Sequence, residues 1–193
     1  MRYAKRFLLS YGQKCEILRE PTEESYVSIK RSTSAIRDFG ARESHWEGLI
    51  ILESELKSGE ILNIADIKYL VQSVHYDPAS LELAWYAVKT NSDLTHQTAS
   101  ETISDDYEKT VSWNTKQTLH AFGEVVTAKL KQREPGLAED TRYLFQVTRM
   151  TGDKEVKMLD RIIFNGRNYK VDAVNDIAMP GVVRIEVSED TRG

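Results

Sequence analysis

The chain has 193 residues, which is enough for one ordinary domain or two small ones and excludes an array of large domains. Lys and Arg total 26 against 30 for Asp and Glu, so the formal net charge is -4, and this balance argues against a protein that coats nucleic acid through its phosphates. Hydrophobic residues make up 40% and charged residues 29%, values that are typical of a folded chain with a packed core.

Apolar and polar residues alternate with a period of two along most of the first half, which predicts an all-β structure. We expect strands at residues 14–19, 25–30, 46–52, 61–71 and 81–88. The fourth of these ranges is long enough for two strands that meet at a tight turn near Ala65 and Asp66. Trp85 is in register with apolar neighbours, so we expect it in the core.

Residues 91–112 are polar and acidic and have little periodicity, which predicts a linker or an exposed excursion between one domain at residues 1–90 and another at residues 113–193. In the second domain we expect strands at residues 123–131, 143–148, 161–164, 168–174 and 182–187. Asn165-Gly166 is a strong hairpin signal, because both residues tolerate the positive φ that a type I′ turn needs.

The two halves of the sequence match at an offset of 100 residues. The matched pairs are Lys57 and Lys157, Glu60 and Asp160, Leu62 and Ile162, Ile64 and Phe164, Tyr69 and Tyr169, Val71 and Val171, and Val74 and Val174. The strand that follows agrees as well, because residues 83, 85 and 87 and residues 183, 185 and 187 are all apolar. This common register favours two tandem small β-barrel or sandwich domains that arose by internal duplication over one single sandwich.

Each half carries a long polar insert between its second and third predicted strands, at residues 31–44 and 132–140. A rigid β scaffold usually places recognition in such loops, although a solvated loop without a role is the alternative interpretation. The candidate channel or docking residues of the two inserts are Arg31, Arg37, Asp38, Phe39, Arg42, Gln132, Arg133, Glu134, Pro135, Glu139 and Asp140.

The sequence lacks the motifs of metal and catalytic chemistry, so we expect no enzymatic activity, no metal and no cofactor. Its four His residues do not have the spacing of zinc ligands, and phosphate-loop, nucleophile-elbow and dinucleotide motifs are missing. Cys15 is the single cysteine and is expected to be a buried, inert thiol. The apolar residues 7–9 are too few for a signal peptide or a membrane span, which predicts a protein that is made in the cytoplasm and does not enter a membrane.

Residues 158–174 (MLDRIIFNGRNYKVDAV) resemble the bacteriophage head-tail connector proteins of the stopper, or head-tail joining, type. Members of this family carry an Asp, an apolar strand, a Gly-containing turn and a Tyr-x-Val segment before a final pair of strands. Asp160, Gly166, Tyr169 and Val171 match that pattern. Tyr69 and Val71 belong to a weaker copy in the first half, in which Ala65-Asp66 stands at the turn. The resemblance covers only a small part of the chain, and members of the family usually have one barrel, not two.

The resemblance implies a structural virion protein that forms a ring of identical subunits in the neck, between the portal and the tail. Its partners would be the portal or an adaptor and the tail proteins, and DNA would pass through the ring without specific binding. Such a ring assembles in the host cytoplasm and ends at the head-tail interface of the virion. In the family, the loop after the second strand can project into the channel and close it, a role that would fall to residues 31–44 or 132–140.

Residues 91–112 are our candidate for an arm that orders when subunits assemble. Two alternatives remain at the level of the sequence. One, of the same class, is a tail terminator or a component of the tail tube or baseplate hub, since these proteins use similar barrels in rings. The other, of a different class, is an oligonucleotide-binding-type module that binds single strands.

Overall fold

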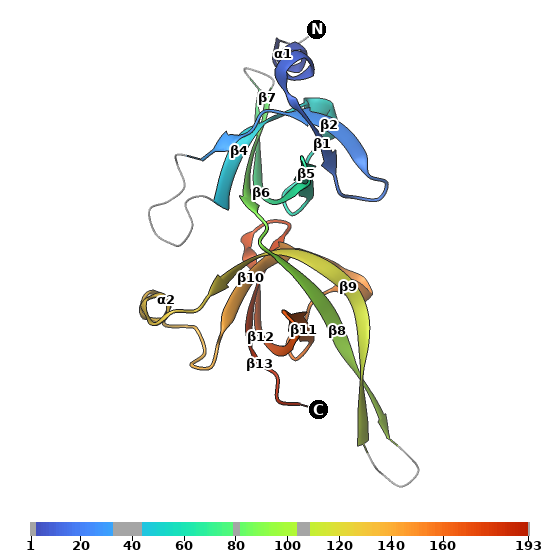
Figure 1. Cartoon of the computed structure of the whole chain (residues 1–193), viewed down its shortest axis with the longest axis vertical. Helices are drawn as coiled ribbons and strands as arrows, with labels where there is room; N and C mark the ends of the chain where they lie inside the picture. The colour runs from blue at the N-terminus through green and yellow to red at the C-terminus, as the bar shows by residue number, and fades with distance from the viewer. Residues whose placement is uncertain (1–2, 33–43, 79–81, 104–108, 193) are drawn as a thin grey trace. The chain divides into compact units, whose positions relative to one another are not determined.

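The computed structural model describes residues 3–32, 44–78, 82–103 and 109–192, and four of the candidate insert residues, Arg37, Asp38, Phe39 and Arg42, lie outside these ranges. The chain divides into two compact units whose main boundary lies between Asn91 and Ser92. Each unit is an antiparallel β structure (Figure 1). In the described part of the chain, no helix is both long and apolar enough to span a membrane.

The first unit begins with a short helix and continues as a sheet that closes on itself. Its elements are α1 (Tyr3–Tyr11), β1 (Gln13–Ile17), β2 (Glu23–Val27), β3 (Lys30–Arg31), β4 (His45–Ile50), a 3-10 turn (Leu52–Ser54), β5 (Ile61–Ile64), β6 (Ile67–Asp77) and β7 (Glu82–Lys89). The strands follow the order β2-β1-β5-β6-β7-β4-β3, and a pairing of Val27 in β2 with Ile50 in β4 closes six of them into a barrel.

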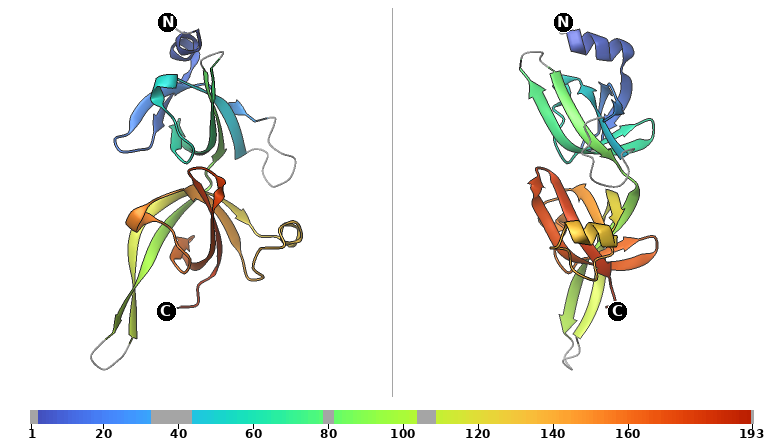
Figure 2. Two further views of the ribbon diagram at one scale, coloured as in Figure 1. Left: turned by 180° about the vertical axis from the view of Figure 1, so that it is seen from behind. Right: turned by 90° about the vertical axis from the view of Figure 1, so that its left-hand side faces the viewer.

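The second unit is a closed barrel of six strands. Its elements are β8 (Ser92–Ile103), β9 (Lys109–Val125), α2 (Ala128–Arg133), β10 (Tyr143–Thr148), a 3-10 turn (Gly152–Lys154), β11 (Arg161–Phe164), β12 (Arg167–Met179) and β13 (Val182–Glu189). The strands follow the order β10-β13-β12-β11-β8-β9. Figure 2 shows each unit from two further sides.

The two barrels have one strand order, in which β8 to β13 take the places of β1, β2, β4, β5, β6 and β7. Their hairpins also share a register at an offset of 100 residues, because Leu62 pairs with Tyr69 as Ile162 pairs with Tyr169. The predicted fold of two tandem β-barrels is therefore confirmed, and the common strand order and register agree with the duplication inferred from the sequence.

The turn before each hairpin repeats at the level of single hydrogen bonds. The backbone N–H of Lys57 donates to Glu60 Oε2 at 2.8 Å, and that of Lys157 donates to Asp160 Oδ2 at 2.7 Å. In both copies the N–H of the third residue of the Tyr-x-Val segment, Val71 or Val171, donates to the carbonyl of that acidic residue at 2.9 Å. The Lys-x-x-acid spacing seen in the sequence thus has a structural cause, because the carboxylate satisfies a backbone donor in a tight turn.

Each barrel has a core of its own, built from side chains that alternate along the strands. In the first unit it surrounds Trp85, and in the second it surrounds Phe145, and both side chains are fully buried. Tyr69, Val71, Tyr169 and Val171 lie in these cores. The predicted core position of Trp85 is confirmed, and Cys15 is buried as expected.

Three segments differ from the predictions. Residues 92–103 and 109–112 belong to β8 and β9, where a linker was expected, and residues 128–131 form the start of α2, where a strand was expected. Thr127 explains the helix, because its side chain accepts the N–H of Leu130 and caps the first turn. Helix α1 was not predicted, and its Leu8 side chain is buried.

Candidate functional site

The hairpin of β8 and β9 is much longer than its counterpart in the first unit. Strands β1 and β2 have 5 residues each, whereas β8 has 12 and β9 has 17. Strand β11 pairs with β8 at residues 95–97, and β10 pairs with β9 at residues 122–125. The part beyond these pairings, residues 98–103 of β8 and 109–116 of β9, is called the arm below, and Figure 1 shows it running on past the other strands of the barrel.

The two faces of the arm differ in chemistry. One face carries three directly paired sets of uncharged polar side chains, Thr98 with Asn114, Ser100 with Ser112 and Thr102 with Thr110. The other face carries Ala99 opposite Trp113 and Glu101 opposite Val111, whose side chain is 41% exposed. On the first face, a hydrogen bond joins the two strands of the arm, because the Ser112 hydroxyl donates to the Ser100 carbonyl at 3.3 Å.

Trp113 anchors the arm to the barrel. The guanidinium carbon of Arg161, from β11, lies 3.7 Å from the centre of the Trp113 ring, and that of Arg192, from the C-terminal segment, lies at 5.0 Å. Both distances are within the range of cation–π attraction. The arm is therefore held at its base by two cations from other parts of the second unit.

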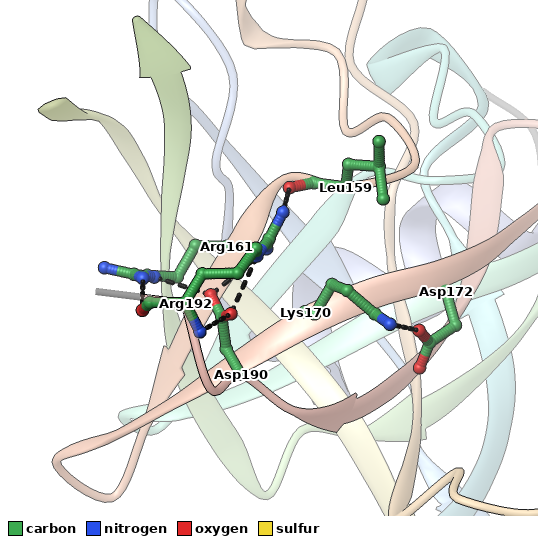
Figure 3. A network of polar contacts seen from close by, with 6 residues as sticks. All are labelled: Leu159, Arg161, Lys170, Asp172, Asp190 and Arg192. Carbon is green, nitrogen blue, oxygen red and sulfur yellow. Dashed lines mark hydrogen bonds and ion pairs between the residues drawn. The ribbon is translucent and has the colours of Figure 1, made fainter. Parts of the chain in front are cut away.

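Asp190 holds the two cations in place, and Figure 3 shows its carboxylate joined to both. It accepts from Arg161 Nε at 2.8 Å and from Arg192 Nε at 2.8 Å, and from the backbone N–H of Arg192 at 3.0 Å. Burial of this fully covered side chain would raise the pKa of Asp190, but the hydrogen bonds from Arg192 and Arg161 outweigh it and lower the pKa to about 2. The carboxylate is thus ionised at any physiological pH.

The arginines also bind backbone carbonyls, which ties the end of the chain to the barrel. Arg161 Nη2 donates to the carbonyl of Arg192 at 2.7 Å, and Arg192 Nη1 donates to the carbonyl of Leu159 at 3.0 Å. We call Trp113, Arg161, Asp190 and Arg192 the latch.

Among its described residues, the first unit has no equivalent of the latch. The residues at the places of Arg161 and Asp190 are Ile61 and Thr90, and the backbone N–H of Thr90 donates to the carbonyl of Lys68 as that of Asp190 does to Asn168. The second copy therefore has the arm and the latch together, and the first copy has neither.

A buried hydrogen bond between side chains lies next to the repeated turn of the second unit. His96 Nε2 is 2.9 Å from Asp160 Oδ2, and the His96 side chain is fully buried. The pairing of β8 with β11 puts His96 at the place that Ile17 has in the first barrel. His96 therefore supports the turn from inside the barrel, where solvent does not reach it.

A hollow of about 420 Å³ lies on the first unit, and it is lined by residues 28–30, which follow β2, and by residues of β4 and β7. Glu47 lines it, and this carboxylate is bound by Lys30 Nζ at 3.1 Å and by the Ser32 hydroxyl at 2.7 Å. Gly48 also lines the hollow. A Cβ at this position would lie 1.8 Å from the Ser28 carbonyl oxygen, so glycine is needed there. Both carboxylate oxygens of Glu47 are thus already bound by neighbouring protein groups.

The described insert residues lie in the segments that follow equivalent strands. Arg31 belongs to β3, and its guanidinium carbon lies 5.8 Å from the Trp46 ring centre. Gln132 and Arg133 end α2, and Glu134 caps it and forms an ion pair with Arg184.

The rest of the second insert is exposed. Pro135, Glu139 and Asp140 lie at the surface, and the carbonyl of Glu139 accepts from Lys131 Nζ. This insert is therefore a capped helix followed by an exposed loop.

The six motif residues have structural roles. Asp160 accepts backbone and imidazole donors, Gly166 has a φ of +72° in the hairpin turn, and the Tyr169 ring packs edge-on against Tyr143 at 5.3 Å. Ala65 and Asp66 adopt positive φ of 50° and 62° without a glycine, so the first copy makes a similar turn. Val171, Tyr69 and Val71 are core residues.

The sequence interpretation missed the latch, because its residues come from three segments that only the fold brings together.

Among the residues that the structure describes, no three His, Cys, Asp or Glu side chains are grouped so as to hold a metal ion.

Comparisons with known proteins do not assign the chain to a family. No family model matches it, and no curated protein matches it. The solution structure of protein SF1141 from Shigella flexneri 2a is similar, with 21% sequence identity and a TM-score of 0.43, over 54% of this chain and 96% of that chain. A likeness of this size carries no argument about function.

Proposed function

We propose that this chain is a structural, non-enzymatic subunit of a virion neck, a head-tail connector that forms a ring between portal and tail. The resemblance of residues 158–174 to connector proteins of the stopper type supports this proposal. The main structural support for the connector proposal is the arm, because each subunit of a ring needs a surface that reaches its neighbour.

The comparison of the two copies explains why the arm matters. Duplicated barrels begin alike, so a feature that one copy has and the other lacks was added to the scaffold or lost from it. The arm adds strand length that buries little apolar surface of its own barrel, and the latch fixes it at the base. A rigid, anchored extension of this kind is suited to contact with another molecule.

The charge of the chain is compatible with a channel for DNA. The formal net charge of -4 makes general attraction to phosphates weak, so a duplex would slide past such subunits without sticking. In this proposal the exposed end of the second insert, at Pro135, Glu139 and Asp140, docks on the tail or narrows the channel.

Purified tailed particles from the source of the sequence test the proposal. We expect mass spectrometry to detect the chain in them and cryo-electron microscopy to show a ring of it between portal and tail. Deletion of residues 135–139 would then give particles that lack tails or leak DNA. If the chain is absent from all particles, or is found only in a tube or baseplate, the connector proposal is refuted.

A further inference from the structure

Both edges of the arm lack a neighbouring strand within the described part of the chain. Residues 98–103 of β8 lie beyond the pairing with β11, and residues 109–116 of β9 lie beyond the pairing with β10. Each edge of such a ribbon offers backbone N–H and C=O groups that a further strand can bind.

The outer strand of the arm, β9, carries charged residues only at the two ends of its arm segment, Lys109 and Lys116. Natural edges are kept short, or carry Lys, Pro or inward charges. Between these two lysines, residues 110–115 (TVSWNT) contain no charge, no Pro and no Gly, and Thr and Val favour extended backbone. The composition is that of a strand that pairs with another strand.

The first unit has a protected edge, which makes the contrast clear within one chain. Its edge strand β3 has 2 residues, Lys30 and Arg31, and both are exposed and basic. The same chain thus has a cation at both residues of the β3 edge and leaves six consecutive uncharged residues, 110–115, along one edge of the arm.

A ribbon of two strands is also marginally stable in water, and a third strand stabilises it. The latch removes some of the freedom of the arm at Trp113, so less entropy is lost when a partner strand adds. These two features favour pairing over a free, solvated hairpin.

From these observations we infer that the arms of two copies of this chain pair edge to edge, with β8 of one copy beside β9 of the next. A second copy fits because one arm offers both edges, of similar length and antiparallel to each other, so copies added in this way continue one antiparallel sheet. Such a contact is head-to-tail, and it closes into a ring if the rotation between copies allows. Closure into a ring rests on the proposed function, whereas the pairing of the arms does not.

Thiol cross-linking of the full chain tests the pairing. Cys15 is buried, and burial raises the pKa of its thiol to about 12, so an introduced cysteine is the reactive one. Ser100→Cys reports the β8 strand, Ser112→Cys reports the β9 strand, and Gln13→Cys, at an exposed position of β1, is the control. We expect a mixture of the first two variants, treated with dibromobimane at high protein concentration, to give several-fold more cross-linked dimer than either alone.

The outcomes are separable. Dimer in Ser112→Cys alone, equal to that in the mixture, would show symmetric pairing and overturn the head-to-tail arrangement. Cross-linking no greater than in the Gln13→Cys control at all concentrations would overturn pairing altogether.

A charge variant that keeps Trp113 provides a second test. Thr98→Lys with Ser112→Lys places one cation on each strand of the arm, as natural edges do. We expect native mass spectrometry to show at least tenfold weaker association than for the wild type. The control, Gln13→Lys with Thr22→Lys, adds the same charge to the first unit and should associate normally.

Equal association of the two double variants would refute arm pairing while leaving the neck proposal open. Paired arms in a chain that is absent from virions would instead refute only the neck proposal.

Discussion

The guanidinium of Arg161 lies 3.7 Å from the centre of the Trp113 ring, and the same guanidinium donates through Nε to Asp190 at 2.8 Å. One buried cation thereby joins the arm, the barrel and the C-terminal segment. Its charge is compensated by a carboxylate that is itself fully covered.

Asp190→Asn should destabilise the second barrel by about 3 kcal/mol, because it leaves the buried Arg161 cation without its counterion. Urea unfolding followed by circular dichroism measures this. Glu155→Gln is the control, since it removes an exposed ion pair with Lys157 and should change the free energy of unfolding by less than about 0.5 kcal/mol. Equal effects of the two variants would contradict the role of the latch.

The same carboxylate predicts a pH dependence. The folded-state pKa of Asp190 is lowered to about 2, so its contribution to stability is present above the unfolded pKa of about 4 and is lost as the pH falls toward 2. Thermal unfolding from pH 5 to pH 2 should show a steeper loss for the wild type than for Asp190→Asn. Parallel curves would show that another group causes the acid loss.

Gly48→Ala should destabilise the first barrel by about 3 kcal/mol or prevent its folding, because the new Cβ would lie 1.8 Å from the Ser28 carbonyl oxygen. Gly136→Ala is the matched control, since a Cβ there meets nothing within 4 Å. Comparison of the two unfolding curves decides the point. A stable Gly48→Ala variant would mean that Ser28 lies further from β4 than the structure places it.

Leu159→Gly should stabilise the second barrel by about 1 kcal/mol, because Leu159 has a φ of +71° and left-handed backbone is costly for a side chain of this kind. The equivalent residue of the first unit is Gly59, with a φ of +90°. Met158→Gly, at the neighbouring exposed position, is the control and should not stabilise. Thermal unfolding of both variants checks this, and a destabilised Leu159→Gly would contradict the strained backbone.

Much of the fold could be predicted from the sequence, because core strands leave a period of two. The hairpins of residues 61–71 and 161–174 also leave matched polar residues, and Glu60 and Asp160 bind the same backbone donor in their turns. The turn at Asn165-Gly166 was evident for the same reason, since its backbone needs positive φ.

The arm could not be recognised as strands, because neither of its faces is buried over its length and so no apolar alternation marks it. Its Thr and Ser residues are as common in loops as in exposed strands. Helix α2 did leave a signal, since Thr127 is a good N-cap, but the preceding β residues obscured it.

The latch left no sequence signal at all. Trp113, Arg161 and Asp190 come from β9, β11 and the residue after β13, and charged and aromatic residues occur singly all along the chain. Only the closure of the second barrel brings them together.

Amide hydrogen exchange measures directly whether the chain assembles through the arm. Peptides that cover residues 98–103 and 110–116 should exchange quickly at low protein concentration and at least tenfold more slowly at a concentration where oligomers form, while peptides of the first barrel stay unchanged. Unchanged exchange in the arm, with oligomers present, would contradict the account and place the interface elsewhere.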